Sequence, residues 1–404
     1  MKKEIKERIE TVYRGEVPDG YRVESGYLIP DDWKTVPLNS RFTRSTRKNK
    51  EGCENVLTIS AQMGLVNQRE FYDKDIASED KSGYFLMKNG EFAYNKSYST
   101  GYPYGAIKQL AKYDEGIVSP LYICFAPKAG TNTAFYTQYF EGGRYNREIY
   151  RIAQEGARNH GLLNIAVEDF FTGTLVEPSA GEQQKIADIL ATCDRVIELK
   201  QQLLEEKRRQ KQWLMYMIFE EQCLMPETTK ELSFDEVFTT CSTRGHQIKT
   251  DQYVAKGLFP VVDQGKRPVV AFSDDKSKLL KCPQTGLIVF GDHTKELKFV
   301  DFDFIVGADG VQLICAKESI LTTEFGYYLL SAKKLPDDGY SRHFKYLKEF
   351  TYSVPDRDTQ NQISFILRGI DNEIVLLETE FELWQQKKKA LMQLLLTGLV
   401  RVNA

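Results

Sequence analysis

Basic, amide and aromatic side chains of this chain gather in short loops, and their chemistry is suited to binding rather than to bond-making. The loops lie at residues 41–50, 95–102 and 144–147, and again at 243–246, 264–267, 292–295 and 340–345. Arg, Lys, Asn, Gln and Ser are the side chains that reach phosphates and base edges in nucleic acids. One basic loop alone is usually a solvated surface, but the recurrence of these loops favours nucleic-acid contact by some of them.

The candidate nucleic-acid contacts are the cationic, His, Ser and Tyr side chains of these loops. They are Arg41, Arg44, Arg47, Lys96, Ser97, Tyr98, Arg144, Arg147, Arg244, His246, Lys266, Arg267, His293, Lys295, Arg342, His343 and Lys345. Three of the four His residues of the chain fall inside the loops, so hydrogen-bonding rings accompany the cationic groups.

Motifs for catalysis are missing from the sequence. Gln264-Gly265-Lys266-Arg267 fails the phosphate-loop pattern and is better explained as a turn, and there is no His-Glu-x-x-His or Gly-x-Ser-x-Gly. Asp301 and Asp303 stand two residues apart and could bind a metal, but the alternating polar edge of a strand explains them better. We therefore expect a binding protein with no catalytic residue and no metal of its own.

Composition limits the class of protein further. The 404 residues suffice for two or three domains. Apolar content of 42% and charged content of 27% are ordinary for a soluble globular protein, and a net charge of −3 makes any nucleic-acid contact local. No apolar run reaches the roughly 18 residues that span a membrane, and the start of the chain lacks the apolar core of a signal peptide. Seven Cys without a Cys-x-x-Cys pair are interpreted as reduced thiols, which indicates a cytoplasmic protein.

The elements that must position these loops are organised around a stretch that occurs twice. Residues 178–219 match residues 355–396 at a constant offset of 177. About a dozen identities fall in roughly forty positions, among them Pro178 with Pro355 and Asp194 with Asp371. One long period of this kind indicates a duplicated unit rather than a solenoid.

Each copy of the repeat predicts a long helix. A Pro stands just before it, and apolar residues then recur in alternating steps of three and four, which is the pattern of a coiled-coil seam. About forty residues at 1.5 Å each make a rod of roughly 60 Å. The two seams are unequal but compatible, so we expect an antiparallel intramolecular coiled coil. The predicted seam residues are Ile186, Leu190, Cys193, Ile197, Leu204, Leu214, Ile363, Leu367, Ile370, Ile374, Leu377, Phe381, Trp384 and Leu391.

The segments outside the helices predict α+β domains, because short β-rich runs alternate there with Gly, Asn and Lys loops and a few helical pieces. The expected order is a lead-in at 1–30, a first head at 31–177, the first long helix at 178–224, a second head at 225–354 and the second long helix at 355–404. Dissimilar heads on similar helices indicate two related tasks on two different targets.

The most specific motif is Pro-x-x-x-Glu-Gln-Gln-Lys-Ile-Ala at residues 178–187, with a copy from Pro355 in which Thr359 replaces the Glu. Together with the lead-in at 26–33 and the ending at 387–398, it resembles the specificity (S) subunit of Type I restriction-modification enzymes. The resemblance covers nearly the whole chain.

This resemblance implies that each head is a target recognition domain that reads one half of an asymmetric, bipartite site in double-stranded DNA. It implies that the helices set the unread spacer and dock two modification subunits, which carry S-adenosylmethionine-dependent adenine methylation. Two restriction subunits, where present, would add translocation and cleavage that use ATP and Mg. The chain itself would then be a non-catalytic subunit acting in the prokaryotic cytoplasm in phage defence.

A rigid rod between the heads predicts that adding or removing about four residues within 190–215 changes the spacer and not the half-sites, because a turn of about 5.4 Å spans one to two base pairs. Exchange of residues 230–352 is expected to change one half-site only. Two other interpretations remain open. One is a coiled-coil scaffold whose heads bind proteins, and the other is a self-contained DNA enzyme with divergent motifs.

Overall fold

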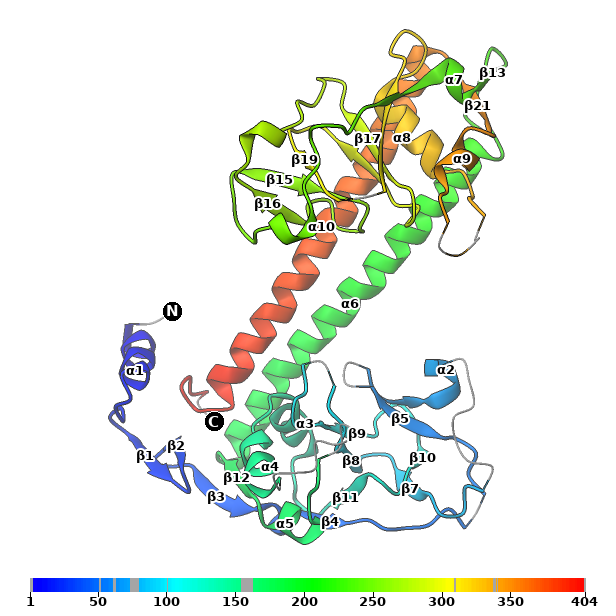
Figure 1. Ribbon diagram of the computed structural model, residues 1–404. Coiled ribbons are helices and arrows are strands. Elements are labelled where there is room, and N and C mark those ends of the chain that lie inside the picture. Colours follow the sequence, from blue (N-terminus) through cyan, green and yellow to red (C-terminus); the bar gives the residue numbers. More distant parts are fainter. Residues whose placement is uncertain are drawn as a thin grey trace. The chain divides into compact units, whose positions relative to one another are not determined.

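The computed structural model describes residues 3–50, 52–60, 63–72, 80–99, 101–153, 163–308, 310–336, 339 and 341–402. The chain forms two compact units (Figure 1). Unit 1 consists of Met1–Leu199 with Phe381–Ala404, and unit 2 consists of Lys200–Glu380. Each unit therefore contains one head and a part of each long helix.

Both predicted long helices are present, and they are antiparallel. α6 runs from Ala180 to Phe219 and α10 from Arg357 to Leu395. In unit 2 they are joined by the ion pairs Lys200–Glu380, Lys207–Glu373 and Lys211–Asp371, at 2.5, 2.6 and 2.5 Å. Residue numbers rise along α6 while those of the partners fall along α10, so the two helices run in opposite directions. The prediction of an antiparallel helix pair is confirmed.

The predicted seam residues all lie on the inner side of the helices. Each of the fourteen is buried or half-buried, and Ile186, Leu190 and Leu367 have no exposed surface. Lys200, Lys207 and Lys211 of α6 interrupt the apolar pattern, and each of them forms one of these ion pairs with α10. A cation in the seam is accommodated because a carboxylate on the opposite helix pairs with it.

The identities at the start of the repeat have a structural cause. Gln183 donates from Nε2 to the carbonyl oxygen of Pro178 at 3.0 Å, and Gln360 donates to Pro355 at 2.9 Å. Both Gln side chains are buried. The Pro and Gln of each copy thus form the same hydrogen-bonded start of a helix, which satisfies a carbonyl group that the helix itself leaves without a partner.

The Glu that the second copy lacks has a role in unit 1 alone. Glu182 is buried, accepts a hydrogen bond from Trp33 Nε1 at 2.9 Å and pairs with Arg401 at 2.9 Å. At the matching position, Thr359 instead bonds to Asp356 near the start of α10. The departure from the motif therefore follows from the presence of Trp33 and Arg401 in one unit only.

The lead-in packs against the end of the chain. It contains α1 (Lys3–Tyr13) and the hairpin of β1 (Tyr21–Glu24) and β2 (Tyr27–Pro30). Tyr21 donates to the carbonyl oxygen of Gly398 at 2.5 Å, and Arg8 donates to that of Leu399 at 2.8 Å. Gly398 has φ of 72°, and a Cβ there would lie 2.5 Å from Pro30. Only glycine fits this end of the helix.

The first head is built on a four-stranded antiparallel sheet in the order β4-β11-β8-β9. The strands are β4 (Phe42–Arg44), β11 (Ile123–Pro127), β8 (Phe92–Asn95) and β9 (Ala106–Gln109). Strand pairs β5 (Leu57–Ser60) with β6 (Gly64–Asn67), β7 (Phe85–Lys88) with β10 (Glu115–Val118), and β3 (Lys34–Pro37) with β12 (Thr174–Glu177) surround it. The helices are α2 (Gln68–Tyr72), α3 (Thr133–Glu141), α4 (Asn146–Ile152) and α5 (Val167–Thr172), with a 3-10 turn at Leu38–Ser40.

The second head repeats this plan. Its antiparallel sheet has the order β14-β20-β17-β18, formed by Phe238–Cys241, Val311–Ala316, Leu287–Gly291 and Leu297–Val300. A second sheet contains β16 (Ala271–Ser273), β15 (Phe259–Val262) and β19 (Ile305–Val306), and β13 (Lys230–Ser233) pairs with β21 (Thr351–Val354). The helices are α7 (Phe234–Val237), α8 (Thr323–Ser331) and α9 (Phe344–Leu347), with 3-10 turns at Thr250–Gln252 and Lys276–Lys278.

The four-stranded sheets of the two heads therefore share one topology, although the remaining sheets and the sequences differ. In both, an early strand pairs with the last strand of the sheet, which pairs with a hairpin, and a helix (α3 or α8) follows the last strand. Aromatic side chains fill the core of the first head, where Phe42, Phe92 and Phe125 are in mutual ring contact. The core of the second head combines aliphatic residues of β17 and β20 with aromatic ones such as Phe234 and Phe238. The same fold is reached with different packing.

Two expectations about single side chains can be compared with the structure. The interpretation of all seven Cys as reduced is wrong for one pair, because Cys241 and Cys315 form a disulfide between β14 and β20. Among the described residues, no group of three or more His, Cys, Asp or Glu side chains could hold a metal ion. No described helix has the length and apolar character to cross a membrane.

Candidate nucleic-acid interface

Equivalent hairpins carry the polar loops in the two heads. The hairpin of β8 and β9 holds residues 96–105, and the hairpin of β17 and β18 holds residues 292–296. Both segments were singled out in the sequence for their polar and aromatic side chains. The shared topology places these loops at corresponding ends of the two sheets, so each head has one candidate interface in a corresponding position.

In the first head the hairpin loop borders a cavity of about 430 Å³. Strand β5, helix α2, the hairpin and the loop before β11 each contribute to it. Its lining residues are Thr58, Ile59, Tyr72, Asn95, Ser97, Tyr98, Ser99, Ala106, Ser119, Leu121 and Tyr122. None of these described residues is charged. The cavity therefore has the hydroxyl, amide and ring chemistry that reads base edges, without the cations that bind phosphates.

Asn95 has a fixed orientation at this cavity. Its Oδ1 accepts a hydrogen bond from the backbone N–H of Ser97 at 3.0 Å, which leaves the Nδ2 donor for another partner. Tyr98 is 65% exposed and Tyr72 is 44% exposed, so two rings are available for contact. Amide donors facing a nucleic acid recognise purine N7 and carbonyl acceptors on base edges.

In the second head, loops that were predicted separately meet. The backbone N–H of His293 donates to Gln264 Oε1 at 3.4 Å, and Thr294 Oγ1 donates to the carbonyl oxygen of Gln264 at 2.5 Å. His293 Nδ1 lies 3.2 Å from the carbonyl oxygen of Ser341. Residues 264–267, 292–295 and 341–345 therefore form one surface. Tyr340 of the last loop and Thr100 of the first head lie outside the described residues.

Asp292 and His343 join two of the loops that form this surface. The backbone N–H of His343 donates to the carbonyl oxygen of Asp292 at 2.9 Å, and that of Phe344 donates to Asp292 Oδ1 at 2.8 Å. His343 Nδ1 lies 3.0 Å from the same carbonyl oxygen, and the side chain has no exposed surface. His343 therefore supports the loops and cannot itself contact DNA in this arrangement.

Cations surround the surface of the second head. Lys266, Arg267, Arg342 and Lys345 are exposed, whereas His293 and Lys295 are half-buried. Half-buried Lys298 donates to the carbonyl oxygens of Asp263 and Arg267 at 2.7 and 2.6 Å and so fixes the loop that carries Lys266. Burial lowers the pKa of Lys298, although the Asp263 carboxylate opposes this. Arg244 is exposed in a neighbouring loop, in which His246 Nδ1 lies 3.2 Å from the carbonyl oxygen of Lys278.

Several basic residues of the first head are engaged within the protein. Arg47 donates to buried Glu91 at 3.2 Å, and Arg144 and Arg147 stack on Tyr27 of the lead-in at 5.8 and 4.9 Å. Ser97 and Tyr98 line the cavity, Lys96 precedes them in the same hairpin, and Arg44 is exposed on β4. The predicted residues of the first head thus do not gather into one site.

Arg41 is part of a buried ion pair. It donates to both carboxylate oxygens of Glu177, at 2.5 and 2.7 Å, and Glu177 has no exposed surface. Tyr136 donates to the same carboxylate, and Lys34 lies 3.6 Å from it. Burial alone would raise the pKa of Glu177, but the hydrogen bonds from Arg41 and Tyr136 outweigh it and lower that pKa below its ordinary value.

We expect Arg41→Gln to change the acid sensitivity of unit 1. A carboxyl group whose pKa is lower in the folded state stabilises the fold above its unfolded pKa, about 4.3, and this stabilisation is lost as pH falls through the folded pKa. The variant should lose about 3 kcal/mol of unfolding free energy at pH 7, because buried Glu177 loses its two bonds to Arg41 and keeps only the exposed Lys34 at 3.6 Å as a cation. Its stability should then fall less than that of the parent between pH 5 and 3. Urea unfolding over this pH range measures both, and parallel curves would contradict the prediction.

Sequence reasoning missed the uncharged residues of the first cavity. Thr58, Tyr72, Ser119 and Tyr122 come from three separate segments, and none of those segments is basic. Gln264 and Ser341 were inside loops already singled out, but the cations beside them were chosen instead. A search for Ser, Thr, Asn and Tyr at both ends of predicted strands, irrespective of charge, would have included most of these residues.

No family model matches the sequence. Among solved structures, the chain is similar to the Type I restriction-modification system S subunit from M. genitalium, with a TM-score of 0.60 at 14% identity over 93% of this chain and 97% of that chain. This chain has the fold of a Type I S subunit. A second similar chain belongs to a structure described as the basis of complex assembly and conformational transition of the type I R-M system. The TM-score there is 0.52 at 12% identity, over 93% of this chain and 100% of that chain.

The likeness to the S-subunit fold extends over both heads and both long helices. It confirms the α+β fold class and, at the level of the fold, the resemblance that the repeat and its opening motif indicated. Identity of 12 to 14% carries no information about which bases the loops contact.

Proposed function

We propose that this chain is the DNA sequence-specificity subunit of a Type I restriction-modification complex. Each head reads one half of an asymmetric, bipartite DNA site, and the long helices set the unread spacer. One observation carries the proposal. The four-stranded sheets of the two heads have the same strand order but carry different polar loops at the equivalent hairpin, and each head is attached to one copy of the helix repeat.

The difference between the two interfaces supports an asymmetric site. Symmetric sites are read by symmetric proteins, so unequal readers require unequal half-sites. The first head offers an uncharged cavity with Asn95 and exposed tyrosines, and the second offers Gln264 and His293 with a border of cations. Two surfaces of such different chemistry would recognise different base edges.

The chain's partners and cofactors follow from the same proposal. Two modification subunits dock on the helices and supply S-adenosylmethionine-dependent adenine methylation, and restriction subunits, where present, supply chemistry that uses ATP and Mg. Exposed apolar residues on the outer faces of the helices, among them Trp213, Phe365 and Leu376, suit such docking. The chain contributes recognition and no catalytic residue, and the complex acts on DNA in the prokaryotic cytoplasm.

A methylation map tests the proposal. The chain is co-expressed with the methyltransferase encoded beside it, and the host DNA is sequenced by a method that reports modified adenine. We expect a single asymmetric motif with two short halves and a constant unread gap. A stable complex that leaves no motif in the host DNA would contradict the proposal and favour a protein-binding scaffold.

We also expect the two heads to differ in their contribution to salt dependence. Replacing Lys266, Arg267 and Arg342 by Gln should make the slope of log affinity against log salt less negative by up to about 3, since each phosphate contact contributes about 0.9. Asn95→Ala should weaken specific binding about tenfold with an unchanged slope, because an amide releases no counterion. Arg195→Gln, an exposed cation on α6, is the matched control for charge. Equal slopes for the triple variant and the parent would exclude phosphate contacts by these three residues.

A further inference from the structure

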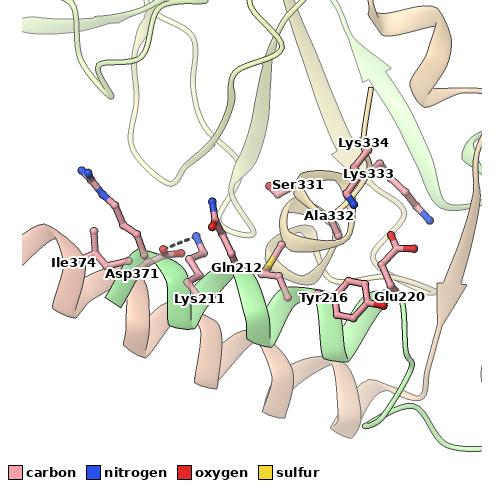
Figure 2. A pocket seen from close by; sticks show the side chains of 12 residues that line it. Lys211, Gln212, Tyr216, Glu220, Ser331, Ala332, Lys333, Lys334, Asp371 and Ile374 are labelled. Carbon is pink, nitrogen blue, oxygen red and sulfur yellow. Dashed lines mark hydrogen bonds and ion pairs between the residues drawn. The ribbon is translucent and has the colours of Figure 1, made fainter. Parts of the chain in front are cut away.

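In unit 2 one carboxylate joins both long helices to the head. Asp371 of α10 pairs through Oδ1 with Lys211 Nζ of α6 at 2.5 Å, as the dashed line in Figure 2 marks. Its Oδ2 accepts a hydrogen bond from the Tyr328 hydroxyl of α8 at 2.9 Å. Tyr328 is only 3% exposed, and burial together with Asp371 raises its pKa. The Tyr328 proton is therefore held in this bond over the physiological pH range.

In unit 1 the same arrangement occurs with another donor. Asp194 of α6 pairs through Oδ1 with Lys388 Nζ of α10 at 2.5 Å. Its Oδ2 accepts from Gln138 Nε2 of α3 at 2.8 Å, and Gln138 is buried. The carboxylate again uses one oxygen for the opposite helix and the other for the head. We call each of these three-residue arrangements a clasp.

The clasps coincide with identities of the repeat. At the offset of 177, Asp194 matches Asp371 and Lys211 matches Lys388. Each of the two ion pairs also borders a cavity. The Lys211–Asp371 pair borders one of about 690 Å³ in unit 2, and the Asp194–Lys388 pair borders one of about 470 Å³ in unit 1. An Ile and a Met from matching positions border each cavity as well. Figure 2 shows Asp371, Lys211 and Ile374 together along the helices. The helix side of the junction is thus built the same way twice.

In each head, the clasp bonds to a helix that packs on the hairpin of the candidate interface. α3 packs on β9 in the first head, and α8 packs on β17, β18 and β20 in the second. The N-cap residues Asn132 and Thr322 start these two helices in the same way, each accepting from the backbone N–H three residues later. Other polar links between head and helices differ between the units, as Asn132–Gln184 and Arg368–Glu324 illustrate. The clasp, in contrast, uses the same two carboxylate oxygens in both units.

We propose that Asp194 and Asp371 are positioning residues that fix the orientation of each head on the long helices and thereby restrict the spacer length that the protein accepts. This inference rests on the proposed function. A seam of apolar residues holds two helices together, but apolar contacts are not directional and constrain the orientation of a head on the helices only weakly. Charge-assisted hydrogen bonds are directional. A carboxylate on one long helix that bonds to the other long helix and to a helix of the head restricts the relative orientation of these three elements.

Tyr328→Phe tests the clasp with the smallest change, because it removes one hydroxyl and leaves the Lys211–Asp371 pair intact. The readout is the ratio of adenine methylation at the native spacer to that at spacers one base pair longer or shorter, in the mapping experiment above. We expect the ratio to fall about tenfold, with both half-sites unchanged, since a hydrogen bond to a charged group is lost. Tyr328→Gln should restore much of the ratio, because Gln138 makes this bond in unit 1.

Glu378→Gln is the control. It removes the ion pair of Glu378 with Arg208, which joins the same two helices at 2.5 Å without a bond to the head, so the spacer ratio should stay at the parent value. Thermal unfolding of all three variants separates loss of fold from loss of orientation. An unchanged ratio in Tyr328→Phe with a normal motif overturns the clasp and leaves the proposed function standing. A parent protein without any motif overturns both.

Discussion

Replacing the second head by a second copy of the first is expected to convert an asymmetric DNA site into a symmetric one. The exchange substitutes residues 34–177 for residues 230–354, so that each head begins at the strand equivalent to β3 and ends just before the Pro of the repeat. Gln138 of the transplanted head would then face Asp371, in the position of Tyr328. Two identical readers on an antiparallel helix pair should select an inverted repeat of the first half-site.

The size of this effect follows from the cost of mismatched bases. Each wrong base pair costs about 1–3 kcal/mol, so loss of a half-site of a few bases should lower methylation of the original motif at least a hundredfold. The reciprocal exchange, with two copies of the second head, is the matched control and should select the other half-site twice. Persistence of the second half-site after its head has been removed would contradict the division of labour between the heads.

The long helices could be predicted because their signal is local and duplicated. Apolar steps of three and four depend only on neighbouring turns, and two copies in one chain confirm each other. The sheet order of the heads could not be predicted in the same way, because strands of two to six residues pair across long stretches of chain. Different core residues hide the common strand order, because the core around Phe42 is rich in aromatic rings whereas the core around Ile314 mixes aliphatic and aromatic residues.

The candidate site was predicted in part, for a related reason. Charge along the sequence locates loops but not the partner of each cation, and the carboxylate that engages Arg41 lies 136 residues further on. His343 appeared available in sequence and is buried beneath the loops that it supports. The uncharged cavity around Asn95 escaped a search based on basic residues. Loop position was therefore predictable, whereas the orientation and availability of single side chains were not.

The largest change in spacer length is expected from inserting four residues into both long helices at once, after Leu199 in α6 and after Glu380 in α10. Four residues add about 6 Å of helix, which corresponds to one to two base pairs of DNA. An insertion of this size is a stutter, which coiled coils tolerate by local unwinding. The half-sites should stay unchanged, because no residue of either head is altered. The methylation map measures spacer and half-sites together.

The same insertion in α6 alone supplies the control. It shifts the lysines of α6 by one turn against their carboxylate partners on α10, including the Lys211–Asp371 pair of the clasp. We therefore expect a less stable protein and weaker methylation from the one-sided insertion than from the matched one. A longer spacer from the one-sided insertion would mean that the ion pairs do not fix the helix register. Altered half-sites from the matched insertion would mean that the helices do not act as a spacer at all.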